Sequence, residues 1–402
     1  MEYPGSALKN ETYADLSHAR LERTSFARLS LVWSRFFNIA NNTGGKMVEF
    51  LTDLISEWHI GLQIAIFVVG LALGTFCLVK FCDFFVDSSS VIAKKLKISP
   101  LIIGLTIVAM GTSLPELAVS VSDSISNIGG GSAELAIGNV IGSNIANILL
   151  VLGFSVVFTP IVVKKSVNRR EMPILLGVTV VTVLFVCLFG LGSLAGDFAI
   201  TRWEGIILVV LIAVYITYLV LMAKKHPEQL DDAETEVAKD MPWWKAIVLL
   251  IVGAAGIILG GQFVVFGAKG IAINGAVALG ADEGLTKSLV GLTIVAVGTS
   301  LPELVTSTIA AKKGQNELAL GNVIGSNIFN SLFVLGISAT VNPLITTSQV
   351  LIDAFVMLGV TVMLFAFALS GKLRKVHGFV LLGCYALYLT YLVLRTVLGW
   401  SF

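Results

Sequence analysis

Residues 104–117 read GLTIVAMGTSLPEL, and residues 291–304 repeat this segment as GLTIVAVGTSLPEL, with 13 of 14 positions identical. A second segment follows each copy: residues 138–147 read GNVIGSNIAN and residues 321–330 read GNVIGSNIFN, with 9 of 10 positions identical. Two long motifs repeated in the same order indicate that the chain consists of two related halves.

The composition places most of the chain in a lipid bilayer. Of the 402 residues, 56% are hydrophobic and 13% are charged, and the mean hydropathy is +0.90. A soluble domain carries about 25% charged residues, so little of this chain is suited to one. The net charge of +1 creates no field that would attract a nucleic acid or another polyanion.

Ten segments have the length and apolarity of a membrane-spanning helix, which needs about 20 residues. They cover residues 60–82, 99–123, 137–159, 173–194, 203–223, 245–267, 287–311, 319–341, 350–370 and 377–399. Each half therefore has five helices, and the two motifs fall on the second and third of them. Because five is odd, the second half must enter the membrane upside down relative to the first.

Lysine and arginine collect in every second connector. The connectors after the first, third, fifth, seventh and ninth helices contain Lys94, Lys95, Lys97, Lys164, Lys165, Arg169, Arg170, Lys224, Lys225, Lys239, Lys312, Lys313, Lys372, Arg374 and Lys375. The other connectors contain Arg202, Lys269 and Lys287. Positive residues stay on the cytoplasmic side, so we expect both termini on the non-cytoplasmic side of the plasma (inner) membrane.

These patterns predict an all-α integral membrane protein with ten transmembrane helices, arranged as two inverted five-helix repeats. The expected units are a polar, flexible N-terminal segment (1–58), a first repeat (59–223), an acidic cytoplasmic loop (224–244) and a second repeat (245–402). Inverted repeats whose interrupted helices meet near the middle of the bilayer are typical of secondary transporters. The four cysteines lie in apolar segments without CxxC spacing and indicate neither a disulfide nor a metal site.

Each copy of the first motif places a proline and a glutamate inside an apolar span. Pro115 cannot donate a hydrogen bond to the carbonyl of Gly111, and Pro302 is placed in the same way, so we expect kinked helices with free carbonyls. Glu116 and Glu303 are the acids expected in mid-span, where an ionisable side chain is costly and indicates function. A pair of protonated glutamates retained for packing is the alternative.

Other oxygen-bearing side chains share these helix faces. Thr112 precedes Glu116 by four residues, and Thr299 precedes Glu303 by four, so each pair lies on one face. The remaining candidates to line the same cavity are Ser113, Ser300, Asn139, Ser143, Asn147, Asn322, Ser326 and Asn330. The second motif also contains glycines four residues apart, so close packing of helices is an alternative role for its polar residues.

Two carboxylates with hydroxyl and carbonyl oxygens suit Ca2+, which takes about 6–8 oxygen ligands. Zinc would require histidine or cysteine, and no histidine lies in the interior of an expected span, since His377 is the first residue of the last one and the other three lie outside. Two carboxylates balance one Ca2+, whereas an empty site would carry two unpaired charges and would be costly to move across the membrane. The charge balance therefore favours exchange, with Na+ or protons returning, and we expect no resident cofactor.

The paired motifs resemble the alpha repeats of the Ca2+/cation antiporter superfamily, and most closely those of prokaryotic-type Na+/Ca2+ exchangers, over about residues 60–398. The resemblance implies that Glu116 and Glu303 ligate Ca2+ and that Thr112 and Thr299 add oxygens. It also implies flanking Na+ sites formed by Ser113, Ser143, Ser300 and Ser326 and by the backbone carbonyls of Ala109 and Ala296. The first and sixth helices would then slide as a gate against the other eight.

The chain departs from the family pattern at one pair of positions. Many relatives carry an aspartate at one of the positions of Asn147 and Asn330, but both residues are asparagine here. The missing charge puts K+ co-transport in doubt. The short loop 224–244 also leaves no room for a large Ca2+-sensing domain.

A H+/Ca2+ antiporter, or one for another divalent cation, with the same fold is the main alternative. Proton-coupled relatives usually carry a GNxxE pattern on the third and eighth helices, whereas this chain has GNVIGSN. An enzyme is disfavoured because the sequence shows no nucleophile–base pair, phosphate loop or set of zinc ligands. A channel would differ from an antiporter in lacking saturable counter-flow.

Overall fold

The structure, a computed structural model, describes residues 52, 60–128, 134–187, 199–225, 241–278, 296–345 and 348–398. Most of the predicted N-terminal segment and of the loop 224–244, and the start of the predicted seventh helix, lie outside these residues. Within the described ranges the chain is mainly helical, and its strands are two residues long.

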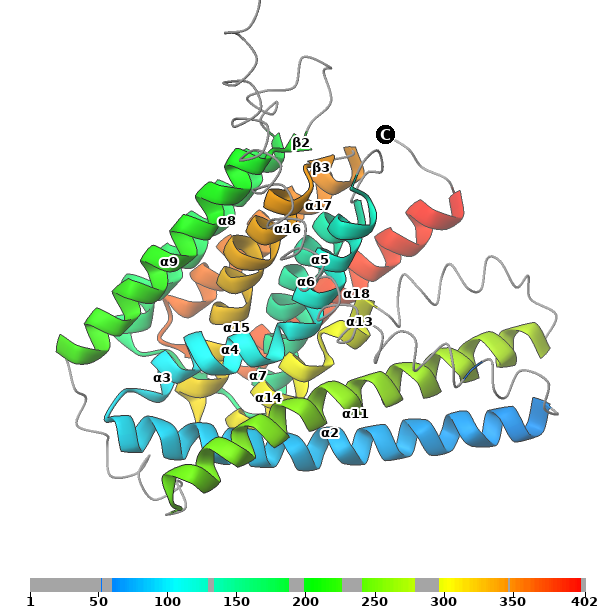
Figure 1. Ribbon diagram of the computed structural model, residues 1–402, viewed down its shortest axis with the longest axis horizontal. Coiled ribbons are helices and arrows are strands. Elements are labelled where there is room, and N and C mark those ends of the chain that lie inside the picture. Colours follow the sequence, from blue (N-terminus) through cyan, green and yellow to red (C-terminus); the bar gives the residue numbers. More distant parts are fainter. Residues whose placement is uncertain are drawn as a thin grey trace, which may run out of the picture.

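Both halves are built from α-helices, marked α (Figure 1), and π-helical segments, marked η, and in each half a π-helical segment follows the helix of the second motif. The first half contains α2 (Ile60–Leu96), α3 (Pro100–Ile103), η1 (Gly104–Val108), α4 (Ala109–Thr112), α5 (Leu114–Ser126), α6 (Glu134–Ala146), η2 (Asn147–Leu152), α7 (Gly153–Phe158), β1 (Ile161–Val162), η3 (Val167–Glu171), α8 (Met172–Cys187), β2 (Ala199–Ile200) and α9 (Arg202–Lys225). The second half contains α11 (Trp243–Ala278), α13 (Ala296–Thr299), α14 (Leu301–Lys312), α15 (Asn316–Phe329), η5 (Asn330–Val334), α16 (Leu335–Val341), β3 (Leu344–Ile345), α17 (Ser348–Ala368), β4 (Lys372–Leu373) and α18 (Lys375–Leu398).

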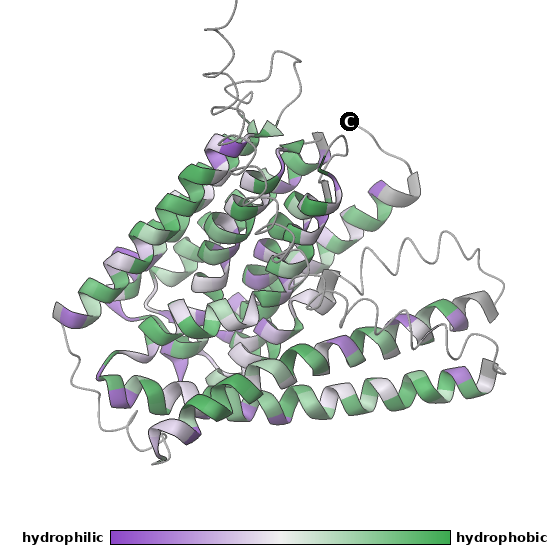
Figure 2. Ribbon diagram, viewed as in Figure 1, coloured by the Kyte–Doolittle hydropathy of each residue, from purple (hydrophilic) through white to green (hydrophobic). Residues whose placement is uncertain are grey.

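The described helices confirm an all-α membrane architecture. Eight of them are long and apolar enough to cross a bilayer, and the bent pair α3–α4 and α5 supplies a ninth crossing. These nine coincide with nine of the ten predicted spans; the predicted seventh span, 287–311, is only partly described. Apolar residues dominate the lengths of α8 and α9, and hydrophilic residues gather near their ends (Figure 2).

The first and sixth predicted helices are longer than their apolar stretches. We expected helices over 60–82 and 245–267, but α2 has 37 residues and α11 has 36. Hydropathy marks where a helix leaves the lipid, whereas backbone hydrogen bonding continues until the chain meets a breaker. The polar end of α2 therefore remains helical outside the predicted span.

Helices α2 and α11 lie side by side and run across one side of the remaining bundle (Figure 1). Their glycines allow the close approach: a Cβ added at Gly74 would lie 2.6 Å from the backbone nitrogen of Val264, and one at Gly260 would lie 2.8 Å from that of Leu78. The glycine-rich faces of the two helices are thus packed against each other.

The motif helices occupy the middle of the bundle. In the span that contains α6, η2 and α7, 78% of the most apolar window is buried, and in the span of α15, η5 and α16 the share is 94%. The other six single-helix spans reach 22–39%. Polar residues of the second motif therefore face protein, because their helices have little contact with lipid.

Two short antiparallel ladders join the halves at connectors. Strand β1 pairs with β4, with Ile161 opposite Leu373, and β2 pairs with β3, with Ile200 opposite Leu344. Each ladder therefore holds a connector of the first half against a connector of the second.

Candidate cation site

Both copies of the first motif form a helix that is broken at its serine. Ser113, between α4 and α5, has φ −86° and ψ 9°, and Ser300, between α13 and α14, has φ −87° and ψ 4°. The two parts of the first broken helix meet at 49°. Pro115 and Pro302 stand in the first turns of α5 and α14, where a missing N–H is tolerated. The kinks predicted from the prolines are confirmed.

The breaks place Glu116 and Glu303 in the first turns of α5 and α14, and both side chains are 0% exposed. The positive end of a helix dipole stabilises a nearby carboxylate. Both carboxylate oxygens of Glu116 and the Oε2 of Glu303 nevertheless have no hydrogen-bond partner among the described residues. The two carboxylates are close enough to repel each other. Buried charges without partners are very unfavourable, so a cation is the natural third member of this group.

The two halves exchange hydrogen bonds at these breaks. Ser113, from the first half, donates its hydroxyl to Oε1 of Glu303, from the second half, at 3.1 Å. Thr112 donates to Oδ1 of Asn322 at 3.1 Å, and its oxygen lies 3.4 Å from that of Ser326. One polar cluster therefore contains the broken helix of one half and the second motif of the other.

The second motif adds further oxygens without partners. Ser143 lies beside the carboxylate of Glu116. Asn147 and Asn330 are 0% exposed, and neither amide oxygen nor amide nitrogen has a described partner. Each begins a π-helical segment, η2 or η5, so the backbone widens at the same point in both halves. The buried hydroxyl of Ser300 is likewise without a described partner.

These unpartnered atoms define what the site can bind. Buried polar atoms are normally hydrogen-bonded, yet here buried carboxylate, amide and hydroxyl groups of the two motifs lack partners among the described residues. Oxygens of this kind are the ligands of Ca2+ and other hard cations. The residues present therefore have the chemistry to hold a dehydrated hard cation.

Three predicted oxygen donors, Ala109, Thr299 and Ala296, differ from these unpartnered atoms. The carbonyl of Ala109 accepts from the backbone of Ser113 at 3.0 Å and from the Thr112 hydroxyl at 3.3 Å. It can reach a cation only through a rearrangement of these bonds. Thr299 is half-buried and already has an interaction partner, and Ala296 is the first residue of α13.

A serine that lies one turn after each glutamate was not predicted as part of the site. Asn139 donates to Ser120 at 3.0 Å, and Asn322 donates to Ser307 at 2.9 Å. The same bond thus links the two motifs in each half. Its signal was present in the sequence, because both serines follow their glutamates by four residues. Asn139 also donates to the backbone carbonyl of Glu116 at 3.3 Å.

The other two asparagines of the second motif, Asn144 and Asn327, make the kind of hydrogen bonds that structural residues make. Asn144 donates to Ser331 at 2.8 Å and so joins the two halves. Asn327 donates to the carbonyl of Val323 at 2.7 Å, within its own helix.

The glycines of the second motif permit close packing in the second half. A Cβ at Gly321 would lie 2.7 Å from the carbonyl oxygen of Leu101, and one at Gly325 would lie 2.7 Å from the Cα of Leu105. A Cβ at Gly138 or Gly142 would meet nothing within 4 Å among the described residues. In the repeat, the segment that Gly321 contacts corresponds to residues 288–292, which lie outside the described ranges. The expectation of close packing is therefore confirmed for Gly321 and Gly325, and it stays a prediction for Gly138 and Gly142.

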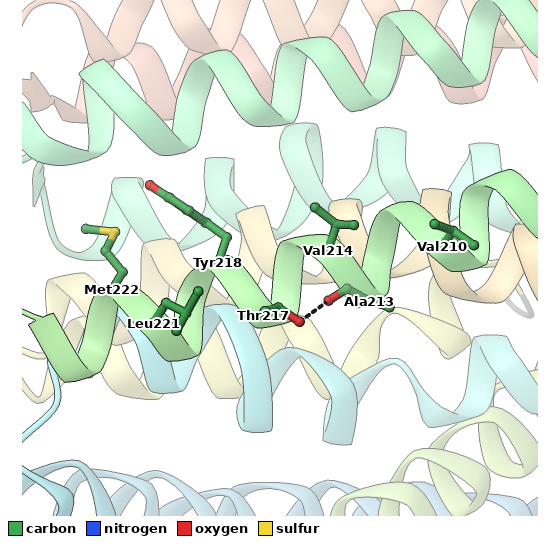
Figure 3. A pocket seen from close by; sticks show the side chains of 7 residues that line it. All are labelled: Val210, Ala213, Val214, Thr217, Tyr218, Leu221 and Met222. Atoms are coloured by element: carbon green, nitrogen blue, oxygen red, sulfur yellow. Dashed lines mark hydrogen bonds between the residues drawn. The ribbon is translucent and has the colours of Figure 1, made fainter.

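The glutamates do not lie in the hollow on the outside of the bundle. That hollow, of about 600 Å³, follows one face of α9 (Figure 3). Its lining residues are Val210, Ala213, Val214, Thr217, Tyr218, Leu221 and Met222. The glutamates instead lie in the interior of the bundle, where neither is exposed.

Comparison with known families identifies the chain. The family described as "Sodium/calcium exchanger protein" matches residues 66–222 and 245–394, which include both copies of both motifs. The chain belongs to this family. As a prokaryotic-type sodium/calcium exchanger within the Ca2+/cation antiporter superfamily, it is a multi-pass membrane transporter and not a member of an enzyme family.

Individual relatives cover most of this exchanger. The sodium/calcium exchanger MaX1 of Methanosarcina acetivorans is 32% identical over 362 residues, which are 80% of this chain and 97% of the relative. The inner membrane protein YrbG of Escherichia coli is 35% identical over 292 residues, which are 70% of this chain and 81% of the relative. A solved structure of the sodium-calcium exchanger NCX_Mj, soaked with Na+ and Sr2+, aligns with a TM-score of 0.66 at 31% identity, over 81% of this chain and 98% of that one.

Proposed function

We propose that this exchanger moves Ca2+ against Na+ through one site shared by Glu116 and Glu303. The observation that carries the proposal is the pair of fully buried carboxylates, one from each half, in which three of the four oxygens lack partners among the described residues. Thr112 and Thr299 would add oxygens to the Ca2+ position. The flanking Na+ positions would use Ser113, Ser300, Ser143, Ser326, Asn147, Asn330 and the backbone carbonyls of Ala109 and Ala296.

Alternating access through two inverted five-helix repeats is the second part of the proposal. A third repeated segment supports the division into two halves: residues 213–221 of α9 read AVYITYLVL and residues 386–394 of α18 read ALYLTYLVL, with 7 of 9 positions identical. In both, a tyrosine contacts a buried acid of the preceding helix. Tyr215 donates to Glu171 at 3.3 Å, and Tyr388 lies beside Asp353.

The connector ladders support the inverted arrangement. β1 and β4 lie in the connectors after the predicted third and ninth helices, both of which are rich in lysine and arginine. β2 and β3 lie in the connectors after the fourth and eighth helices, which the charge pattern assigns to the opposite side. Each ladder thus joins connectors predicted to share a side. We therefore propose that the basic connectors are cytoplasmic and that both termini are not.

Charge balance explains why such a site would exchange ions and not leak them. Two carboxylates in a low-dielectric interior repel each other strongly unless cations neutralise them. A loaded site can therefore cross between its two end states more readily than an empty one. Ca2+ in one direction and Na+ in the other meet this requirement with the same oxygens.

Uptake of 45Ca2+ into proteoliposomes identifies the ion that is exchanged for Ca2+. We expect uptake when the vesicles are loaded with Na+, and none when choline replaces it. Uptake that follows a proton gradient in the absence of Na+ would identify the alternative, a H+/Ca2+ antiporter with the same fold. Vesicles that contain Glu116→Gln protein serve as the control for leak.

A further inference from the structure

An ion-paired cluster joins the polar end of α2 to the end of α14. The ammonium of Lys313 lies 3.0 Å from Oδ1 of Asp83 and 2.7 Å from Oδ1 of Asp87. It also lies 3.4 Å from the backbone carbonyl of Asp83. The two aspartates are four residues apart, so they share a face of α2. Lys313 directly follows α14, and its ammonium contacts three oxygens of α2. It therefore links the two helices.

A buried contact lies next to this cluster on the way to the cation site. The thiol of Cys82 is 3.5 Å from the hydroxyl of Thr306, and both residues are 0% exposed. Cys82 directly precedes Asp83, and Thr306 lies on α14, three residues after Glu303. α2 therefore covers the side of α14 that leads from Lys313 towards Glu303.

The cluster joins the two helices and is accessible to water. Side-chain exposure is 26% for Lys313, 36% for Asp83 and 20% for Asp87, so water reaches each of them. Burial lowers the pKa of Lys313, but hydrogen bonds to Asp87 and Asp83 and their negative charges outweigh it and raise the pKa above its ordinary value. The ammonium therefore stays charged at neutral pH, and the ion pairs persist.

The arrangement has no sequence counterpart in the first half. In the alignment of the two first motifs, the positions of Lys312 and Lys313 correspond to Ile125 and Ser126 of the first half. α5 therefore ends without a lysine, and the repeat does not require this ion-paired contact. A feature present in only one half acts on only one of two otherwise related end states.

We propose that Lys313, Asp83 and Asp87 form a latch that holds α2 against α14 and closes the route to Glu303 from the side of the membrane where Lys313 lies. Lys313 is a positioning residue: it sets how often α2 leaves α14, without touching the transported ion. The latch rests on the proposed alternating access. Its release exposes the Cys82–Thr306 contact to water.

Cys82 supplies a reporter for the latch. A full-length variant in which Cys77, Cys187 and Cys384 are replaced by alanine keeps Cys82 as its single thiol. In proteoliposomes, the rate of labelling by a membrane-impermeant maleimide measures how often α2 separates from α14. We expect Lys313→Gln to raise this rate about 3- to 10-fold, in the range set by a partly exposed ion-pair network. Lys313→Arg should restore the slow rate.

The neighbouring lysine provides a matched control. Lys312 has the same charge, but its ammonium lies over the ring of Phe158, 4.5 Å from the centroid, and not on α2. Lys312→Gln should leave the labelling rate unchanged. If Lys313→Gln protein is poorly folded, the charge-swapped pair Asp87→Lys with Lys313→Asp replaces it, and slow labelling of that pair supports the latch.

Equal labelling of the Lys313→Gln and Lys312→Gln variants would overturn the latch. The 45Ca2+ flux of the same vesicles keeps its failure distinct from failure of the proposed function. A protein that labels as predicted but transports no Ca2+ retains the latch and loses the exchange. One that transports Ca2+ but labels identically in both variants retains the exchange and loses the latch.

Discussion

Glu116 and Glu303 are buried without the partners that buried carboxylates normally have. Removing an ion from water into a protein interior costs several kcal/mol even after relaxation, and each glutamate recovers part of this cost from a helix N-terminus, about 0.3–1 kcal/mol. Ser113 adds one hydrogen bond to Glu303, whereas neither carboxylate oxygen of Glu116 has a hydrogen-bond partner among the described residues. The remaining cost is offset when a cation binds, which links ion binding to the stability of the folded protein.

Ser120 is expected to support the site from behind. It accepts the amide of Asn139 and donates to the carbonyl of Ala136 at 3.3 Å. Ser120→Ala removes one acceptor from the half-buried amide of Asn139, which costs about 1 kcal/mol. We predict a lower thermal unfolding temperature in detergent and weaker Ca2+ binding.

Ser124 is the matched control on the same helix. It is 0% exposed, and its hydroxyl has no hydrogen-bond partner among the described residues. Ser124→Ala should be neutral or slightly stabilising, because it removes an unsatisfied polar atom. If both variants lose the same stability, the loss comes from the cavity and not from the Asn139 bond.

Among the helices, two glycines in different surroundings allow a test within one molecule. Gly321→Ala, on α15, would push a Cβ to 2.7 Å from the Leu101 carbonyl oxygen, whereas at the exposed Gly177, on α8, a Cβ meets no described atom within 4 Å. Overpacking costs about 1–3 kcal/mol, while alanine in an open helical position gains about 0.5–1 kcal/mol over glycine. We predict that Gly321→Ala lowers the unfolding temperature and that Gly177→Ala does not. Equal effects would contradict the close approach of α15 to the helix that contains Leu101.

The features of the site that local chemistry fixes could be predicted from the sequence. Pro115 and Glu116 predicted a kink and a buried acid because a proline and a charge have the same consequence in any apolar helix. Ser120 and Ser307 were missed because serine is common in such helices, and a partner on another helix is not visible along the chain. The close approach of Gly321 to the carbonyl of Leu101 follows from how the helices pack, which the motif alone cannot reveal.

At the scale of the whole molecule, composition and the repeated motifs were sufficient for the membrane architecture and the family. The lengths of α2 and α11 were underestimated because hydropathy measures contact with lipid and not the persistence of a helix. The segment YxTYLVL, shared by α9 and α18, was overlooked because its residues are ordinary for a membrane helix. Its tyrosines became meaningful only when the structure placed them beside Glu171 and Asp353.

Inverted repeats predict that the two ends of the described chain face the same side of the membrane. Ten crossings return the chain to the side on which it began, and the basic connectors assign that side as non-cytoplasmic. A peptide tag after Phe402 should therefore be digested by protease added to intact cells. Protection in intact cells, with digestion only after permeabilisation, would contradict both the orientation and the positive-inside assignment.

Equilibrium binding of 45Ca2+ to purified protein, measured with and without Na+, tests directly whether the two glutamates form one site. We predict one Ca2+ bound per chain, displaced by Na+, and a loss of affinity of about 100-fold or more in both Glu116→Gln and Glu303→Gln, since each removes a charged ligand worth about 3 kcal/mol or more. Glu204→Gln, which alters a buried acid that caps α9 near Thr201, is the control and should bind normally. Normal Ca2+ binding by either site variant, or Ca2+ binding that Na+ does not displace, would contradict a single site shared by the two glutamates.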